Sequence, residues 1–589
     1  MCKVFRFLSC FFLLALVFLS SATVFAAGSS ADRFIDVPVG NWADEAIHEA
    51  CEKNITQGIQ QNVFGYGKTV KRSEFVKFLV SLMGWELSNP EQGSFEDNQN
   101  KKAWYYKYIE TAVDHGVVLK DGKRFRPDDD ITREEMAVMI VRSLGYDGFA
   151  KHLDSLGKPF RDVENYAGYI TIAKDLGIVT GKELQGKYLF EPKSTAKREE
   201  AVVMLMRLYS KLNRPLDELH AFYAIRSYNQ KDFISGLTSV SFGWSSLDYD
   251  SDSDRIFLNT ERFNNNNFYI PDAFTEPVEL ARQKGVSTQL TVFASQEKKV
   301  YDKDSKREVG MIEYALAKPE RRRKIIDDIV AQLKHTGKDG DIVSFDGVVI
   351  DFECMKGDAL KGLFNVFLDE LKESLEGKKL YVAVHPVRKA GQAYYDGYDY
   401  RSIGRIADKV ILMAHDYNAV ALTAAEMSGG YNDTPLSPLD EVYYALKSIT
   451  DKDTGVEDSG KIWLQISFDA VQWKMAEGKV INQIAFRPDY EQIFKRLTDQ
   501  ESTENLSMRH HKDLRYSWLT FHNKEDNTDN IIWYEDSRSV LAKVQLAKLF
   551  GVGGISLWRL GNIPAFQDVG PSRLYLDVWQ ELLKLKNGQ

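Results

Sequence analysis

A short motif occurs three times near the N-terminus, and this internal repeat restricts the fold more than any other feature of the chain. Its two markers are an aspartate two residues after a phenylalanine and an arginine followed by acidic residues, and both recur with steps of 61 and 65 residues. Acidic residues after the arginine favour the first turn of a helix, where the helix dipole stabilises negative charge. We therefore predict three helical modules, over residues 33–90, 91–150 and 156–212.

The repeated motif resembles the S-layer homology (SLH) module. The resemblance implies an all-α bundle of three modules whose grooves bind a secondary cell-wall polymer. A guanidinium can hold an anionic sugar through two hydrogen bonds, and a tryptophan can stack on a sugar ring. The residues implied to line the grooves are Asp36, Trp42, Arg72, Asp97, Trp104, Arg133, Asp162 and Arg198. The alternative is that the aspartates and arginines only cap helices and pair within the bundle. In the third module Asn165-Tyr166 replaces the tryptophan.

The first residues have the features of a secretory signal. Lys3 and Arg6 precede an apolar run over residues 7–19, and Val24 and Ala26 fit a cleavage site. The run is shorter than the ~20 residues of a membrane span, so a signal peptide over residues 1–26 is favoured over an anchor. We expect a secreted protein of the bacterial cell wall or S-layer surface, with no transmembrane segment after signal removal. The net charge of −9 argues against a nucleic-acid partner.

The second half of the chain has a different pattern, in which short apolar runs alternate with helical stretches. Eight runs are predicted to be strands: residues 221–224, 237–242, 288–293, 347–352, 379–384, 409–413, 461–467 and 554–558. Repeated βα units of this number predict an α/β TIM barrel over residues 216–589. Three further predicted strands, over residues 480–486, 515–521 and 530–534, suggest a small α+β insertion at about 475–540, between barrel strands seven and eight.

Two acidic residues stand at the end of the fourth predicted barrel strand. Asp351 and Glu353 are two positions apart, so both side chains lie on the same face of the strand. Two carboxyl groups in one barrel mouth are costly to ionise together, which raises the pKa of one of them. A glutamate with a raised pKa can serve as a general acid near neutral pH. The alternative is a purely structural pair of acids.

The segment from Asp346 to Glu353 resembles the DGxxxDxE signature of glycoside hydrolase family 18, the chitinase-like fold. The similarity continues through Tyr381–Pro386, Met413–Tyr417 and Gly554–Arg559, and it is closest to bacterial wall and spore-cortex hydrolases. The resemblance implies substrate-assisted hydrolysis with retention, in which Glu353 is the general acid and Asp351 supports the acetamido group of the substrate. It also implies that Trp558 stacks under the sugar and that Asp416 and Tyr417 position the acetamide.

The chain departs from the family pattern at two positions. Val349 occupies a place where many members carry a further acid, and His415 replaces the usual tyrosine. A histidine there can donate a hydrogen bond, but it also introduces a group that titrates near pH 6.5. Weaker candidates for contact with the sugar are Tyr223, Gln465 and Trp533, each of which could instead belong to the core. No spacing typical of a metal site or of a cofactor motif is present, so neither a metal nor a cofactor is predicted.

Three functions follow from these features. The first is a surface-anchored glycosidase that cleaves β-1,4 bonds after N-acetylglucosamine in peptidoglycan and is held on the wall through SLH modules. The second is a chitinase that acts on external chitin-type glycans. The third is a non-catalytic, lectin-like wall or S-layer protein on the same fold, because fold alone does not decide function.

Overall fold

The computed structural model describes residues 34–153, 157–184, 186–336, 340–387, 395–417, 420–499, 501, 503–569 and 573–588. The predicted signal peptide lies outside these residues. The chain forms two compact units. One extends to Leu144 and adds Phe160–Val163 and Gly181–Arg207, and the other comprises Gly145–Pro159, Glu164–Thr180 and Leu208–Gln589. In the part of the chain described, every helix is too short or too polar to cross a bilayer.

The first unit is built mainly from the helices of the repeat. They are α2 (Asp44–Glu52), α3 (Arg72–Met83), α4 (Tyr106–Asp114), α5 (Arg133–Ser143) and the first turns of α8 (Arg198–Leu212). A short antiparallel hairpin, β1 (Lys182–Leu184) and β2 (Lys187–Leu189), accompanies them, so this unit is not purely helical. Thr132 caps α5 by accepting a hydrogen bond from the Glu135 amide, as the acidic first turn predicts.

The repeat aspartates each hold a turn of their own module. Asp36 accepts hydrogen bonds from the backbone amides of Phe64, Gly65 and Tyr66. Asp97 and Asp162 accept the corresponding pairs of amides 28 and 29 residues further on. The residue 29 positions after each aspartate has positive φ in all three modules: Gly65, Arg126 and Glu191. Two of these are not glycine, so the carboxylate bonds offset the cost of the left-handed backbone.

The repeat arginines link the modules in a closed cycle. Arg72 donates to the carbonyl of Phe125 and stacks on its ring, and Arg133 does the same with Phe190. Arg198 closes the cycle by donating to the carbonyl of Phe64 and stacking on that ring. Each arginine therefore carries the contact from its own module to the next.

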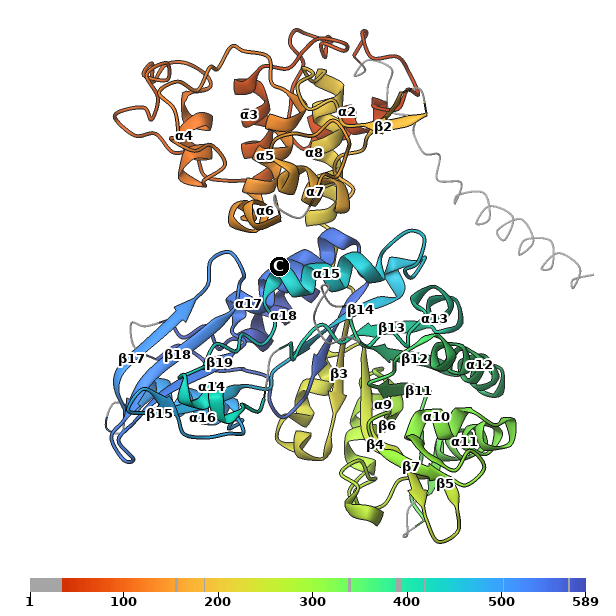
Figure 1. Cartoon of the computed structure of the whole chain (residues 1–589). Coiled ribbons are helices and arrows are strands. Elements are labelled where there is room, and N and C mark those ends of the chain that lie inside the picture. The colour runs from red at the N-terminus through yellow and green to blue at the C-terminus, as the bar shows by residue number, and fades with distance from the viewer. Residues whose placement is uncertain are drawn as a thin grey trace, which may run out of the picture. The chain divides into compact units, whose positions relative to one another are not determined.

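The second unit contains a closed parallel barrel (Figure 1). The eight strands are β3 (Glu218–Tyr223), β4 (Ser239–Asp250), β6 (Ser287–Ser295), β11 (Gly347–Glu353), β12 (Lys379–Val384), β13 (Lys409–Leu412), β14 (Ile462–Ser467) and β20 (Gly554–Trp558). Each pairs in parallel with its neighbours, and the β20–β3 and β3–β4 pairings close the ring. The predicted TIM barrel is confirmed, with strand bounds shifted by up to a few residues and with β4 extended well beyond the predicted end.

Helices between the strands lie outside the barrel, as Figure 1 shows for α11 (Pro319–Gln332) and α12 (Asp358–Ser374). Further helices follow most other strands: α9 (Thr275–Gln283), α10 (Met311–Leu316), α13 (Tyr400–Ile406), α15 (Leu439–Ile449) and α17 (Ser537–Phe550), with α18 (Val578–Lys586) at the end. The buried face of α12 carries Leu360, Phe364, Phe367, Leu368 and Leu371 at helical spacing. This apolar face accounts for the position of α12 against the sheet.

The interior of the barrel is packed rather than hollow. Phe222, Val349, Tyr381, Ile411 and Trp463 form one buried cluster, and Trp558 packs against it. Val349 therefore belongs to the barrel core. His220 also lies inside, between the hydroxyls of Ser241 and Ser556, and burial lowers its pKa to about 3. A ligand can therefore be bound at the ends of the strands but not inside the barrel.

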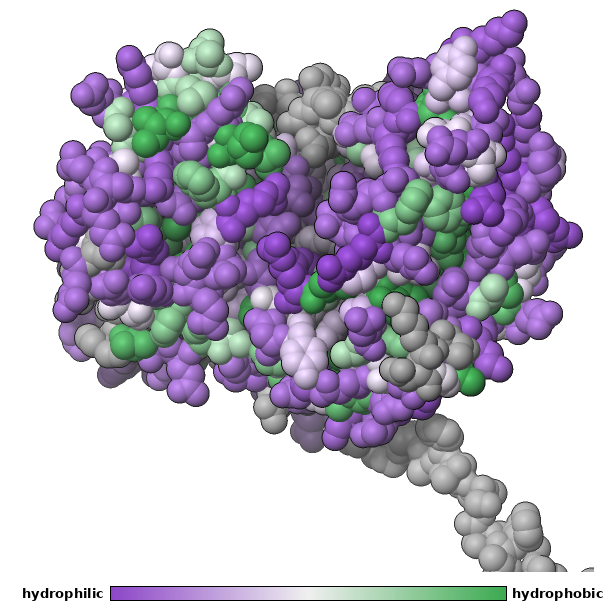
Figure 2. Space-filling model, turned by 90° about the horizontal axis from the view of Figure 1, so that it is seen from below, coloured by the Kyte–Doolittle hydropathy of each residue, from purple (hydrophilic) through white to green (hydrophobic). Residues whose placement is uncertain are grey.

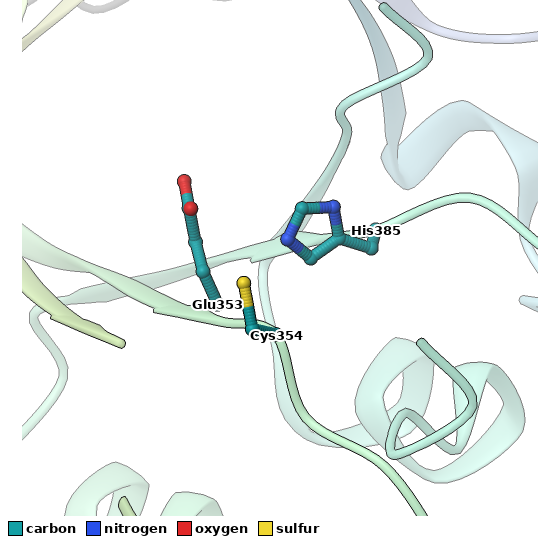
Figure 3. A group of neighbouring side chains, drawn as sticks. All are labelled: Glu353, Cys354 and His385. Carbon is teal, nitrogen blue, oxygen red and sulfur yellow. The ribbon is translucent and has the colours of Figure 1, made fainter. Parts of the chain in front are cut away.

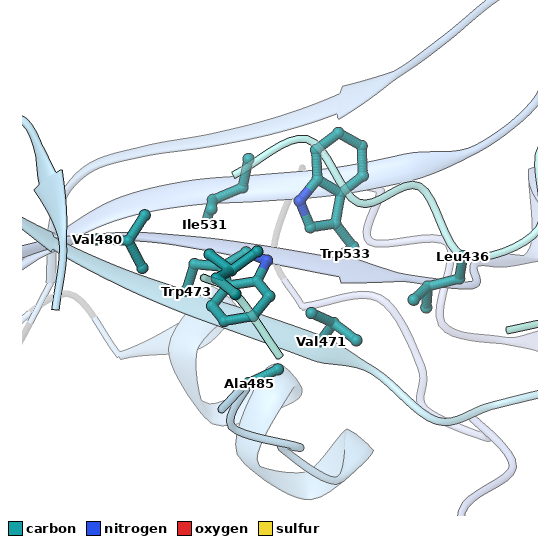
Figure 4. Close-up of a cluster of buried hydrophobic side chains, with 8 residues drawn as sticks. Leu436, Val471, Trp473, Val480, Ala485, Ile531 and Trp533 are labelled. Atoms are coloured by element: carbon teal, nitrogen blue, oxygen red, sulfur yellow. The ribbon is translucent and has the colours of Figure 1, made fainter. Parts of the chain in front are cut away.

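A five-stranded antiparallel sheet lies in the sequence between β14 and β20. Its order is β16 (Lys479–Val480), β15 (Val471–Ala476), β19 (Thr528–Tyr534), β18 (Ser517–Asn523) and β17 (Thr503–His510). Figure 4 shows the apolar side chains that hold it, among them Trp473, Ile531 and Trp533. The strand predicted over residues 480–486 is wrong beyond Val480, where only isolated bridges occur. Asn482 interrupts pairing there by bonding its side chain to the backbone of Lys474, Gln472 and Ile484.

Five short strands in the first half of the barrel domain were not predicted from the sequence. They are β5 (Arg255–Asn259), which pairs with the extension of β4, and two hairpins, β7 (Lys299–Asp302) with β8 (Arg307–Gly310) and β9 (Lys334–Thr336) with β10 (Ile342–Ser344). They are only three to five residues long, and charged residues such as Arg255, Lys299 and Arg307 begin most of them, so no extended apolar run or alternation marks them.

Candidate active site

The two acids of β11 lie at its C-terminal end, as their spacing predicts. β11 pairs with β6 along its whole length, up to Glu353 opposite Ser295, but with β12 only as far as Ile350. The last residues of β11, from Asp351 to Glu353, therefore pair with β6 but not with β12. Asp351 is only 5% exposed, whereas Glu353 is half-buried.

Burial perturbs both carboxyl groups. Desolvation raises the pKa of Asp351 well above its usual value, and the neighbouring Glu353 raises it further. Desolvation also raises the pKa of Glu353, with a contribution from Asp416 in the same direction. His415 lowers the pKa of both acids but does not cancel these effects. At least one proton is thus retained by this pair to higher pH than for free carboxyl groups.

His415 follows β13 and is held between two oxygen atoms. Its Nδ1 lies 2.8 Å from Oδ2 of Asp416, and its Nε2 lies 2.6 Å from Oε1 of Gln465. Two oxygen acceptors favour the imidazolium, in which both ring nitrogens carry a proton. Although burial opposes the charge, Asp416 and the two hydrogen bonds raise the pKa of His415. Asp416 has a left-handed backbone, with φ of 54°, which folds it back beside the histidine.

Trp558 ends β20 and forms part of the wall of an open cavity of about 650 Å³. The edge of its ring meets Phe222 of the barrel core, with centroids 5.3 Å apart. The Trp558–Arg559 peptide bond is cis. The indole contacts the barrel core at Phe222, and the cavity gives a ligand access to the residue. A role for Trp558 in stacking on a sugar stays a prediction.

The weaker candidates are less accessible than the sequence suggested. Tyr223 is 3% exposed and packs against Phe242 and Trp244, and burial raises its pKa to about 12. Trp533 is also buried, in the apolar cluster of the antiparallel sheet, and donates to the carbonyl of Asn432. Both positions fit the core alternative. Gln465 is buried too, but it contacts His415 and therefore belongs to the site as a supporting residue.

Tyr417 lies next to Asp416 and is half-buried. Its hydroxyl is 3.4 Å from the carbonyl oxygen of Glu441, and its amide donates to the carbonyl of Leu436. These contacts place the ring on the side of the mouth that carries α15. A role for Tyr417 in holding the acetamide stays a prediction.

Two residues beside Glu353 were not predicted as a group. Figure 3 shows the thiol of Cys354 between the side chains of Glu353 and His385, and donor atoms of the three lie within 4.8 Å of one another. Thiolate, imidazole and carboxylate are the usual ligands of Zn²⁺, so the group has the chemistry to hold such an ion. A metal there would occupy the carboxylate of Glu353. The signal available in the sequence was that β11 and β12 are neighbours, so that Cys354 and His385 follow adjacent strands.

In the repeat unit, the side chains predicted to line grooves differ in accessibility. The arginines are nearly buried, at 9% for Arg72, 5% for Arg133 and 4% for Arg198, and they bond to protein groups. The tryptophans are open to solvent, at 61% for Trp42 and 53% for Trp104. The arginines are thus engaged within the bundle, and the tryptophans form the accessible part; a role of either in binding a polymer stays a prediction.

Comparison with known proteins gives two family matches. The model of glycosyl hydrolases family 18 matches residues 306–562, a range that contains Asp351, Glu353, His415 and Trp558. The S-layer homology domain matches residues 94–137 and 159–202, which contain the second and third repeats.

Two curated relatives are similar over part of the chain. An exoglucanase XynX of Acetivibrio thermocellus is 30% identical over 177 residues, which are 29% of this chain and 16% of that protein. An S-layer protein sap of Bacillus anthracis is 28% identical over 187 residues, 31% of this chain and 22% of that protein. The chain therefore spans about a fifth or less of the length of these two relatives.

Among solved structures, the spore cortex-lytic enzyme SleL of Bacillus cereus is 18% identical with a TM-score of 0.46, over 71% of this chain and 81% of that one. The C-terminal domain of a putative chitinase from Desulfitobacterium hafniense is 18% identical with a TM-score of 0.46, over 64% and 99%. Residues 306–562 thus carry the pattern of glycosyl hydrolases family 18, and residues 94–137 and 159–202 carry that of the S-layer homology domain.

Proposed function

We propose that this chain is a surface-anchored glycosidase that cleaves β-1,4 bonds after N-acetylglucosamine in peptidoglycan, by substrate-assisted hydrolysis with retention. The observation that carries the proposal is the pair Asp351 and Glu353 at the end of β11, buried in the barrel mouth with raised pKa values. A carboxyl group that keeps its proton near neutral pH is the requirement for a general acid. The family match over the same residues supports this assignment.

In the first step, protonated Glu353 donates its proton to the glycosidic oxygen as the bond to the anomeric carbon breaks. The carbonyl oxygen of the substrate's own acetamido group attacks that carbon and forms an oxazolinium ion. Asp351 accepts the acetamido N–H and stabilises the positive charge. In the second step, Glu353 takes a proton from water, and the water oxygen opens the oxazolinium ring from the face that the leaving group left.

The remaining residues of the mouth orient the sugar. Trp558 forms the apolar floor under the ring, and Asp416 and Tyr417 surround the acetamide. His415 stands where a tyrosine hydroxyl is usual, and as an imidazolium held by Asp416 and Gln465 it supplies positive charge near both acids. It thereby favours the ionised form of Asp351, the form that stabilises the oxazolinium ion.

The repeat unit provides the anchor. The polymer would stack on the exposed indoles of Trp42 and Trp104, over the frame that the aspartates and arginines hold. Tyr166 at the corresponding place in the third repeat is 43% exposed and offers a smaller surface. A secreted enzyme held in this way stays beside peptidoglycan, which favours that substrate over external chitin.

The mechanism is tested by the anomer that forms first and by the need for an N-acetyl group. ¹H NMR of the reaction should show the β-anomer first, and the matched oligosaccharide with free amino groups should not be cleaved. The α-anomer as the first product would contradict retention, and equal cleavage of the de-acetylated substrate would contradict substrate assistance. Binding of both glycans without turnover would favour the lectin-like alternative.

A further inference from the structure

The cavity beside Trp558 has an unusual charge for a site that would bind a neutral sugar. Three arginines line it: Arg226, Arg262 and Arg559. The other described lining residues are neutral, and they include Asn265, Asn266 and Asn267. A cavity of this kind, next to the floor of a sugar site and without an acidic lining residue among those described, attracts an anion.

The two arginines next to Trp558 are held together by the backbone. Arg226 lies at the start of the 3₁₀ segment η2 (Ile225–Gly236) that follows β3, and Arg559 follows β20. Gln230 of η2 accepts hydrogen bonds from the amides of Gly561 and Ile563, at 2.8 and 3.1 Å, and donates to the carbonyl of Ile563. Hydrogen bonds therefore link the segment that carries Arg226 to the segment that follows β20 and carries Arg559.

Glycine is required where these segments meet. Gly561 has φ of 92°, and a side chain there would come within 2.4 Å of the carbonyl oxygen of Arg226. The close approach keeps the segment of Arg226 against the segment that follows Arg559. The fold thus fixes the backbone segments that carry Arg226 and Arg559 relative to each other before any ligand binds.

Hydrogen bonds of Asn266 hold another part of the cavity wall. The side chain of Asn266 donates to the carbonyls of Asn259, Glu261 and Phe268, and it accepts from the Phe268 amide and the Ser246 hydroxyl. Phe268 stacks on Phe293 of β6, with ring centroids 4.5 Å apart. Arg262, on the same loop, bonds to the hydroxyl of Tyr269 and stacks over its ring.

The positive charges of Arg226 and Arg559 repel each other. Burial lowers the pKa of Arg559, and the neighbouring Arg226 lowers it further, while Asp469 acts in the opposite direction. Asp469 also pairs with Arg487, at 3.4 Å, so it is shared between two cations. A carboxylate bound between Arg226 and Arg559 would relieve their repulsion and could bond to both planar guanidinium groups.

We propose that this cavity is a subsite for a carboxylate carried by the glycan strand, and that it makes the enzyme prefer an acidic N-acetylated glycan to neutral chitin. The inference rests on the proposed function, because it places the glycan in the barrel mouth. Two sources present the same chemistry in peptidoglycan: the carboxylates of the stem peptide, and the lactyl carboxylate of muramic acid, which is free only where the stem peptide is absent.

The test uses the full chain with three soluble glycans of equal length. They are peptidoglycan strands with stem peptides, the same strands after amidase removal of the peptides, and N-acetylglucosamine oligomers. The variants are Arg226→Gln, whose side chain is exposed, and Arg282→Gln as a matched exposed control on α9. The measured quantity is the ratio of kcat/KM on each acidic glycan to kcat/KM on the neutral one.

We expect Arg226→Gln to lower this ratio about 10-fold or more, the loss that accompanies a charge-assisted hydrogen bond, and Arg282→Gln to leave it unchanged. A loss only on the amidase-treated strands assigns the lactyl carboxylate, which is an amide while the peptide is attached, and a loss only on the strands with peptides assigns the stem peptide. A loss on both acidic glycans shows that the cavity accepts either carboxylate. An unchanged ratio in Arg226→Gln overturns the subsite while the hydrolase stands.

If no glycan is cleaved, the proposed function fails and the subsite is judged by binding alone. Calorimetry of the Glu353→Gln chain with the same glycans then supplies the ratio of affinities, together with the corresponding Glu353→Gln/Arg226→Gln chain. Tighter binding of the acidic glycan that weakens with Arg226→Gln supports the subsite, and equal binding of all three glycans overturns it.

Discussion

Arg198 tests whether the repeat arginines hold the frame of the anchor or grip its ligand. Its Nε donates to the Phe64 carbonyl at 3.0 Å, and its Nη1 donates to Glu74 at 2.8 Å. Its Nη2 donates to the Gln57 carbonyl at 2.8 Å. Burial lowers the pKa of the guanidinium and Glu74 opposes this, so the cation depends on its partners. Replacement by lysine keeps the positive charge, but one ammonium group can reproduce only one of the three hydrogen bonds.

The expected cost of Arg198→Lys follows from the two bonds that are lost. At about 1.5–3 kcal/mol for each hydrogen bond of a charged group, the loss is about 3–6 kcal/mol. In a unit of this size, each kcal/mol lowers the melting temperature by about 2–4 °C, so the repeat unit should melt about 6–24 °C lower.

Differential scanning calorimetry of the full chain measures both units together. The exposed Arg207 of the same helix provides the matched control, because Arg207→Lys should leave the transition in place. Sedimentation of the chain with purified cell walls, well below the lowered transition, then measures anchoring, which should persist in Arg198→Lys. The reasoning is refuted if Arg198→Lys leaves the transition unchanged and abolishes wall binding.

Three further predictions concern the barrel. His415→Gln should move the basic limb of the kcat/KM pH profile to higher pH. The imidazolium lowers the pKa of Glu353, so without it Glu353 keeps its proton to higher pH. A basic limb that moves to lower pH would contradict this direction. EDTA should leave turnover unchanged, whereas Zn²⁺ should inhibit it, because the ion would occupy the carboxylate of Glu353. Cys354→Ser should weaken this inhibition, and equal inhibition of the wild-type and Cys354→Ser chains would place the ion elsewhere. Glu535→Gln should lower the unfolding free energy of the barrel by about 3–5 kcal/mol in urea, because it leaves the buried Lys543 without its 2.7 Å carboxylate partner. The control is the exposed Lys584, which pairs with the half-buried Glu581, and Lys584→Gln should cost under about 1 kcal/mol.

The barrel and its acids could be predicted because the sequence carries them as local patterns. The strand that ends in Asp351 and Glu353 is an apolar run with acids at period two, and each of the other barrel strands is a similar run between helices. The repeat was visible from its spacing alone. The aspartates could not be assigned from sequence, because a carboxylate that holds a turn and one that binds a ligand have the same neighbours in the chain.

Features that depend on closure of the barrel were not predictable. Arg226 and Arg559 are 333 positions apart and meet only because β20 pairs with β3. Cys354 and His385, in contrast, follow the adjacent strands β11 and β12, so the predicted strand order was a signal for their proximity. For Tyr223 and Trp533 the sequence left two alternatives open, because an aromatic residue near a strand end can face the mouth or the core; both side chains are buried. The face seen in Figure 2 shows mainly hydrophilic residues with small separate apolar groups, so surface hydropathy marks no site there.

The central claim is that Glu353 cleaves the bond after N-acetylglucosamine in the cell wall. The most direct measurement is borohydride reduction of purified peptidoglycan after digestion by the full chain, followed by mass spectrometry of the reduced sugars, beside the Glu353→Gln chain. The account predicts reduced N-acetylglucosamine ends with the wild-type chain and a loss of about 10²-fold or more with Glu353→Gln. Reduced muramic acid ends, or equal release by both chains, would contradict it.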